Sequence, residues 1–217
     1  MEEIKVKYPI GDQDFRSVRE GGFMYVDKTS YIEKILDGGQ YYFLARPRRF
    51  GKSLFLSTLK YFFLGERELF KGLHIDQTEW EWEKYPVLHI DLNTSRYESI
   101  GLLENVLDRL FREWEKKYDV EVKDSDYSQR FATIIEAAHR KTGLRVVILV
   151  DEYDKPLVGN LNKDENFDDY RSRLASLYSN FKSSAEHIRL VFLTGVSRFR
   201  RGAYDTMCFP HFRWNGF

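Results

Sequence analysis

The sequence has 217 residues, a length that suits one large domain and is short for two. Hydrophobic residues make up 42% and aromatic residues 16%, which is enough to build a core and excludes an intrinsically disordered chain. Lysine and arginine number 34, as do aspartate and glutamate, so the overall charge gives no reason to expect nucleic acid or an anionic membrane as a partner.

Compartment and membrane attachment follow from a few local features. The single cysteine, Cys208, excludes an intrachain disulfide and a cysteine-rich zinc site and fits a reducing compartment. Residues 1–7 carry acidic and basic side chains and lack the apolar stretch of a secretory signal. The longest apolar runs, 41–45 and 146–150, are too short to span a bilayer. We therefore expect a cytoplasmic protein without a membrane partner.

The first predicted strand and helix flank a short loop. Residues 41–44 are apolar and stop near Arg46-Pro47, a turn signal. Residues 55–63 then repeat apolar side chains at helical spacing. Because three consecutive residues cannot share one helix face, at least one aromatic side chain of 61–63 should be partly exposed or meet another element.

Further strands follow, separated by helical patterns. Strands are predicted at 86–92, 145–150 and 189–194, and helices at 103–114, 131–138 and 170–181. The strand at 145–150 is continuously apolar after its first residue, which is typical of a strand buried on both faces of a parallel sheet. Strands that alternate with helices predict an α/β fold, with a mostly parallel sheet and helices on both faces.

The loop after the first strand carries a variant phosphate-binding motif. Its residues are Arg46, Pro47, Arg48, Arg49, Phe50, Gly51, Lys52 and Ser53. In the pattern G-x-x-x-x-G-K-[ST], Lys52 reaches the β- and γ-phosphates, the Ser53 hydroxyl binds Mg²⁺, and Gly51 lets the backbone approach the phosphates. Arg46 stands where the pattern asks for glycine, so the match is partial. A chance Gly-Lys-Ser at a helix start is the alternative interpretation.

An acidic pair, Asp151 and Glu152, follows the most apolar strand. Carboxylates at the carboxyl end of a buried strand lie on the edge where open α/β sheets bind ligands. There Asp151 can hold Mg²⁺, while Glu152 orients and deprotonates a water. A helix N-cap is the alternative interpretation of the pair. With Lys52 and Ser53, the pair indicates phosphoryl transfer.

A cation aimed at the γ-phosphate would complete such a site. The candidates are Arg46, Arg48 and Arg49 in the loop and Arg198 after the fourth strand, of which we favour Arg198 and Arg49. Thr194 and Ser197, at the end of that strand, are candidates to contact the attacking water or the γ-phosphate. A turn that caps the next element explains them equally well.

Several short segments stand out in combination. They are Pro9-Ile10-Gly11 with Asp14-Phe15, residues 25–29, 46–53, 151–156 and 194–199. Together they resemble the bacterial and archaeal family of predicted AAA-ATPase-like proteins, over residues 9–199. The resemblance implies a phosphate-loop NTPase domain that binds ATP and Mg²⁺ through Lys52, Ser53, Asp151 and Glu152. It also implies that Arg46 is normal at its position, and that Asp27 lies near the base or ribose.

The end of the sequence departs from the family pattern. Residues 202–217 are rich in aromatic side chains without helical or alternating spacing. We therefore assign residues 1–201 to the nucleotide-binding domain and 202–217 to an atypical tail. The last strand and the helical lid of such ATPases would then be absent, and the first strand would be an unprotected edge.

The expected function is ATP binding and hydrolysis. The main alternative is a non-hydrolysing nucleotide-dependent switch or interaction scaffold, which keeps Lys52 and Asp151 but does not need Glu152 as a base. Proteins of this family are often two-part chains with a restriction-nuclease-like region after the ATPase part. The resemblance thus leaves room for a homo-oligomer or a protein partner, and for nucleic acid only indirectly.

Two rival functions have weaker support. Glu121 and Lys123 have the acid-x-Lys spacing of some nucleases, but a solvated charge run over 115–126 explains them better. Arginines at 46–49 and 198–201 could serve a nucleic-acid-binding module. Each of these clusters adjoins a motif whose phosphate chemistry already explains its charge.

Overall fold

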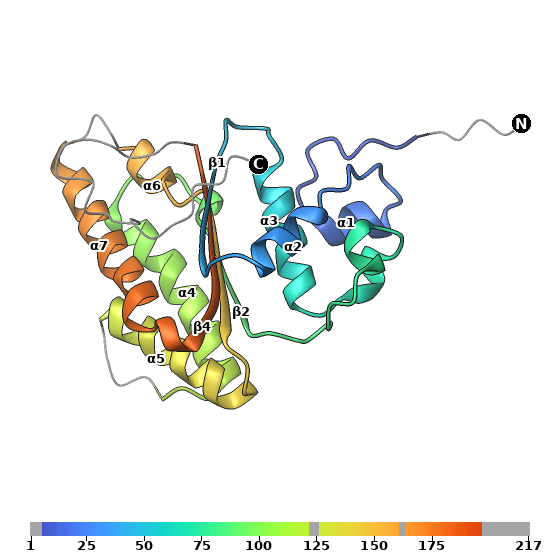
Figure 1. Cartoon of the computed structure of the whole chain (residues 1–217). Coiled ribbons are helices and arrows are strands. Elements are labelled where there is room, and N and C mark those ends of the chain that lie inside the picture. The colour runs from blue at the N-terminus through green and yellow to red at the C-terminus, as the bar shows by residue number, and fades with distance from the viewer. Residues whose placement is uncertain (1–5, 122–125, 161–163, 197–217) are drawn as a thin grey trace, which may run out of the picture.

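The computed structural model describes residues 6–121, 126–160 and 164–196. Within them, four strands form one parallel sheet (Figure 1). Their order across the sheet is β1 (Tyr41–Ala45), β4 (Ile188–Gly195), β3 (Val146–Asp151) and β2 (Val87–Asp91). All four lie where the sequence predicts a strand, which confirms the α/β class. The register pairs Ala45 with Gly195 and Asp91 with Asp151, so the carboxyl ends of the strands meet at one edge.

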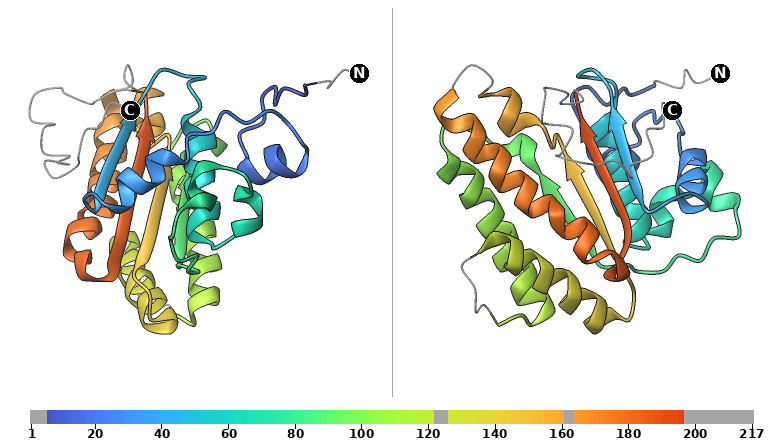
Figure 2. Two further views of the ribbon diagram at one scale, coloured as in Figure 1. Left: turned by 45° about the vertical axis from the view of Figure 1, so that its right-hand side comes forward. Right: turned by 60° about the vertical axis from the view of Figure 1, so that its left-hand side comes forward.

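Helices cover both faces of the sheet, as predicted (Figures 1 and 2). One face carries α4 (Ile100–Tyr118), α5 (Tyr127–Thr142), α6 (Lys155–Val158) and α7 (Asp164–Ser183), and the other carries α1 (Phe15–Glu20), α2 (Ser30–Leu36) and α3 (Lys52–Phe63). Short 3-10 helices lie in the connections: η1 (Arg67–Phe70), η2 (His74–Gln77), η3 (Leu92–Thr94) and η4 (Ala185–His187). None of the helices in the described ranges is both long and apolar enough to cross a membrane.

Alternation along the central strand divides the core into two parts. Ile148 and Val150 of β3 join the cluster formed with α4, α5 and α7, whereas Val147 and Leu149 join the cluster formed with α3. Every residue of β3 is buried, which confirms the predicted strand buried on both faces. The sheet is therefore a rigid layer between two cores, and its carboxyl edge is the part that remains open to a ligand.

An aromatic cluster lies beneath α3. The sequence predicts that one of residues 61–63 is partly exposed or meets another element. Phe62 meets other elements: its ring centroid is 6.1 Å from that of Phe70 in η1 and 5.1 Å from that of Trp82. Phe15 of α1 is fully buried and lies 4.7 Å from Phe70, centroid to centroid. Neither α1 nor α2 is predicted from the sequence, because each spans fewer than two turns and is too short for a repeated apolar pattern. This aromatic packing holds α1, and α2 contacts α3 through Tyr31, whose ring centroid is 6.4 Å from that of Phe55.

One edge of the sheet is formed by β1 in the residues that the structure describes. This agrees with the expectation that the first strand is an edge. The atypical tail at 202–217, Arg198 and Ser197 lie outside the described residues, and so does most of the acid-x-Lys segment that begins at Glu121.

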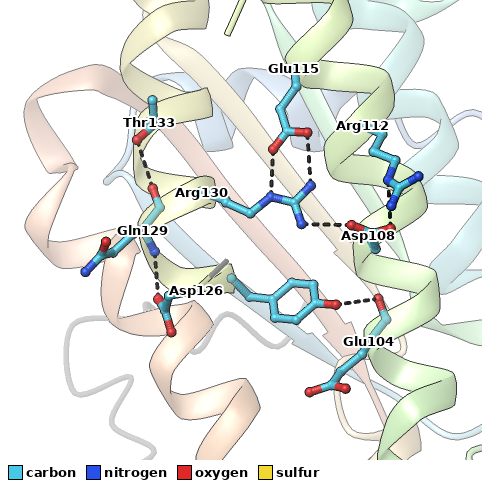
Figure 3. Close-up of polar contacts among 9 residues, drawn as sticks. Glu104, Asp108, Arg112, Glu115, Asp126, Gln129, Arg130 and Thr133 are labelled. Carbon is cyan, nitrogen blue, oxygen red and sulfur yellow. Dashed lines mark hydrogen bonds and ion pairs between the residues drawn. The ribbon is translucent and has the colours of Figure 1, made fainter. Parts of the chain in front are cut away.

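A charged network joins α4 to α5 on one face of the sheet (Figure 3). The Arg130 guanidinium donates from Nε and Nη2 to the two carboxylate oxygens of Glu115, at 2.7 and 2.9 Å. Its Nη1 donates to Asp108 Oδ1 at 2.8 Å, and Asp108 also pairs with Arg112. The side chains of Arg130 and Glu115 are only 9% and 5% exposed, so each neutralises the buried charge of the other.

We expect Arg130→Ala to lower the free energy of unfolding by about 3 kcal/mol, because Glu115 would keep its buried charge without a partner. Urea denaturation measures this loss. The matched control is Arg140→Ala, since Arg140 lies on the same helix, is 72% exposed and pairs with Glu136 one turn away. The control should stay within about 0.5 kcal/mol of the parent. Equal losses in the two variants would contradict the assigned role of the network.

Candidate nucleotide-binding site

The loop between β1 and α3 leaves the sheet beside β4. The Arg46 backbone N–H donates to the carbonyl oxygen of Gly195 at 3.2 Å, which fixes the start of the loop. Two residues then adopt left-handed backbone conformations, Arg49 at φ 68° and Gly51 at φ 74°. Glycine adopts this conformation at no steric cost, and Gly51 is the residue immediately before α3. The loop therefore turns sharply so that α3 begins at Lys52, with its free backbone N–H groups at the carboxyl edge of the sheet.

Lys52 joins the two halves of the predicted site. Its Nζ lies 3.1 Å from Glu152 Oε1 and also donates to the carbonyl oxygen of Pro47 at 3.4 Å. The two charged side chains are 3% and 14% exposed. The structure thus brings together the lysine of the loop and the carboxylate that follows β3, which are far apart in the sequence.

Thr194 of β4 organises the end of β3. Its hydroxyl is fully buried, donates to Asp151 Oδ1 and accepts a hydrogen bond from the Glu152 backbone N–H at 3.1 Å. The Tyr153 N–H donates to the Thr194 carbonyl oxygen at 2.9 Å. These contacts hold Glu152 at φ 51°, a conformation that costs free energy for a residue with a side chain and that occurs at functional sites.

Close packing fixes the same strand ends further. A Cβ atom on Gly195 would lie 2.6 Å from Cε1 of Tyr153, so only glycine fits there. The Val196 N–H donates to Asp154 Oδ2 at 3.0 Å. The segment after β3 is thereby attached to the end of β4 on both sides of Gly195, and the acidic pair has little freedom to move with its backbone.

A cavity of about 820 Å³ opens at this edge of the sheet. Its wall is formed by Pro9, Ile10, Gly11, Asp12, Gln13, Arg48, Arg49, Gly51, Lys52, Ser53, Leu54, Asn93, Glu152 and Lys155. Four of these side chains are cationic and two are carboxylates. The volume falls in the range of about 300–1,000 Å³ that is common for small-molecule sites. Most of the predicted loop residues and Glu152 therefore share one cavity.

The other predicted site residues that the structure describes are not part of the cavity wall: Arg46, Pro47, Phe50, Asp151, Thr194 and Asp27. Phe50 is 63% exposed and is not part of the cavity wall. Asp27, expected near the base or ribose, accepts hydrogen bonds from the N–H groups of Thr29 and His74 and so ties α2 to η2. Burial alone would raise the pKa of the Asp27 carboxyl, but these hydrogen bonds outweigh it and hold the pKa below its usual value.

Four parts of the cavity wall are not among the predicted site residues: the segment 9–13, Leu54, Asn93 and Lys155. The segment is anchored to α3, because the Phe15 N–H donates to Ser57 Oγ at 2.9 Å and the Tyr61 hydroxyl donates to Asp14 Oδ2 at 3.0 Å. Both this segment and Lys155 lie in or beside motifs that carry the family resemblance, and these motifs are the sequence feature that could have marked them as site residues. Asn93 carried none, since it is a single polar residue after a strand.

The comparisons with known proteins identify the family of the chain. The family model described as "Predicted AAA-ATPase" matches residues 9–203. A relative from Azotobacter chroococcum mcd 1, described as "Uncharacterized protein in vnfD 5'region", is 41% identical over 197 residues, which is 90% of this chain and 38% of the relative. The chain thus spans well under half of that protein's length. No solved structure matches. By its sequence and by its α/β fold of the phosphate-loop NTPase type, the chain belongs to the predicted AAA-ATPase family.

Proposed function

We propose that the chain binds Mg²⁺-ATP in the cavity at the carboxyl edge of its sheet and hydrolyses it. The observation that carries this proposal is the contact of 3.1 Å between Lys52 Nζ and Glu152 Oε1. It places a cation suited to bind phosphate and a carboxylate suited to activate water within reach of the same small volume. Family membership supports the nucleotide as ligand.

The phosphate chain would lie against the loop and the first turn of α3. Backbone N–H groups at a helix N-terminus attract anions, and α3 begins with Lys52 and Ser53 on the cavity wall. Arg48 and Arg49 line the same wall and add positive charge. Arg49 is therefore the described candidate for the cation that stabilises the γ-phosphate during transfer, whereas Arg198 remains a prediction from the sequence.

The donors for Mg²⁺ are the Ser53 hydroxyl and the Asp151 carboxylate. They fit the ion chemically, because Mg²⁺ prefers oxygen ligands and keeps several waters. Asp151 Oδ1 accepts a hydrogen bond from the Thr194 hydroxyl, and Oδ2 has no hydrogen bond within the described residues, so one oxygen is left for a metal. When bound, Mg²⁺ would neutralise charge on the phosphates. Thr194 would act as a positioning residue for this ligand.

Hydrolysis needs Glu152 to exchange its partner. In the structure its carboxylate neutralises Lys52. Phosphate oxygens that bind Lys52 would take over that neutralisation and leave Glu152 free to accept a proton from a water near the γ-phosphate. Binding and activation would thus be coupled through a single lysine.

The same ion pair also favours the second candidate function, a nucleotide-dependent switch without turnover. Release of Glu152 from Lys52 would by itself be a change that depends on bound phosphate, and a second copy of the chain or another protein would respond to it. The two candidate functions differ in whether Glu152 acts on water.

We expect Lys52→Ala to weaken Mg²⁺-ATP binding by about 100-fold, because a charge-assisted contact to the phosphates is lost. Isothermal titration calorimetry measures the affinity. The matched control is Lys60→Ala, since Lys60 lies two turns further along α3 and its Nζ lies 5.2 Å from the Tyr61 ring centroid rather than in the cavity. If Lys60→Ala lost affinity as Lys52→Ala did, the loop would not be the binding site.

We expect Glu152→Gln to lower ATP turnover by about 100-fold or more, because an amide cannot take a proton from water. Affinity for Mg²⁺-ATP should rise by about 5-fold, since the phosphates no longer compete with a carboxylate for Lys52. Phosphate release and calorimetry on the same samples measure the two effects. Glu136→Gln, an exposed change on α5, is the control and should leave both unchanged.

The outcomes separate the two functions. Turnover in the parent that is lost in Glu152→Gln supports hydrolysis. Binding by the parent without any phosphate release would overturn hydrolysis and leave the switch. Turnover that persists in Glu152→Gln would assign the base to another residue.

A further inference from the structure

A second lysine, Lys155, lies on the cavity wall outside the residues assigned above. It is the first residue of α6, and its backbone N–H donates to the Glu152 carbonyl oxygen at 2.9 Å. Its ammonium group donates to two oxygens of Asn93, the backbone carbonyl at 2.7 Å and Oδ1 at 2.6 Å. Asn93 lies in η3, directly after β2, and lines the same cavity. Lys155 therefore spans the ends of β2 and β3.

The charge of Lys155 has no counter-charge within the described residues. Both of its acceptors are neutral oxygens, and no described carboxylate lies within the distance of an ion pair. Lys52 differs, because Glu152 already neutralises it. An ammonium group held by two neutral acceptors on the wall of a cavity keeps its positive charge available for an anion that enters.

The position of Lys155 indicates which part of a nucleotide it would meet. Glu152 is the residue proposed to activate water, so the terminal phosphate would lie on its side of the cavity. Lys155 is hydrogen-bonded through its backbone to Glu152 and shares that wall, whereas Arg48 and Arg49 belong to the loop before α3. A cation at Lys155 would thus approach the γ-phosphate from the segment after β3 and not from the loop before α3.

We propose that Lys155, held by Asn93, is a γ-phosphate-binding residue that lets the chain distinguish a nucleoside triphosphate from a diphosphate. This inference rests on the proposed function, because it requires a nucleotide in the cavity. It adds to that function a cation supplied by the chain itself, on the segment after β3 rather than on the loop. The ammonium retains its neutral tether to Asn93 while it contacts the phosphate, since a lysine has three protons to donate.

The test compares the affinities of Mg²⁺-ADP and of Mg²⁺ with the non-hydrolysable β,γ-imido analogue of ATP, by calorimetry on the whole chain. We expect the parent to bind the analogue more tightly than ADP. Lys155→Met should reduce this preference by about 10-fold to 100-fold and leave ADP affinity within a factor of about two, because only the γ-phosphate contact is lost. Lys155→Arg should retain most of the preference, since it keeps the charge.

Two further variants control for indirect effects. Lys141→Met removes a lysine that also donates to two oxygens, those of Lys117 and Asp119, but at the end of α5, which precedes the amino end of β3. It should change neither affinity. Asn93→Ala removes the side-chain acceptor and keeps the ammonium, so its preference should fall less than that of Lys155→Met.

The possible failures are distinguishable. Loss of the preference in Lys155→Met with intact ADP binding supports the inference. Three results would overturn the inference and leave the nucleotide site in place. The first is an unchanged preference in Lys155→Met, and the second is equal affinity of the parent for both ligands. The third is a greater loss of preference in Asn93→Ala than in Lys155→Met. No binding of either ligand by the parent would overturn the proposed function and this inference with it. Thermal melts of each variant verify that the fold is intact.

Discussion

The ammonium group of Lys52 is almost completely buried, and the arrangement of the site follows from the need to neutralise it. Transfer of an unpaired ammonium from water into a protein interior costs several kcal/mol, so such a group must have an anionic partner. Glu152 is that partner in the structure. A phosphate chain offers more negative charge in the same place, so a ligand can replace the carboxylate without leaving the lysine unpaired. The ion pair with Glu152 thereby keeps the buried ammonium neutralised until an anionic ligand replaces the carboxylate.

Two features of the sheet make this contact possible. Parallel pairing in one register brings the ends of β1, β3 and β4 to a common edge, so residues far apart in sequence meet there. Thr194 then fixes the chain beyond β3, because its hydroxyl binds both the Asp151 carboxylate and the Glu152 N–H. The left-handed backbone of Glu152 is maintained by these bonds. Two apolar cores hold the strands on either face, so the edge need not supply its own stability.

The parts of the site that the sequence predicts are those with a local signal. The strands were found because their apolar runs are short and continuous, and the loop because Gly51, Lys52 and Ser53 follow a recognisable pattern. The ion pair between Lys52 and Glu152 and the hydroxyl contact of Thr194 depend on tertiary packing, and no local spacing encodes them. The same holds for α1, whose Phe15 packs against Tyr25 and Phe70, and for α2, whose Tyr31 packs against Phe55 of α3. Asp27 lies in a segment that carries the family resemblance, and its hydrogen bonds in the structure join α2 to η2.

Charge distribution links the site to the rest of the molecule. The whole chain has equal numbers of cationic and anionic residues, yet the cavity wall has four cationic side chains and two carboxylates. One of those carboxylates, Asp12, accepts hydrogen bonds from the Ser17 hydroxyl and the Asp14 N–H, and these contacts lower its pKa. Asp12 therefore stays ionised at neutral pH and counts as one of the two negative charges. Even so, the cavity wall has an excess of positive charge, whereas the whole protein has none. Within the cavity, Lys52, Lys155, Arg48 and Arg49 line one small volume, where their charges act together.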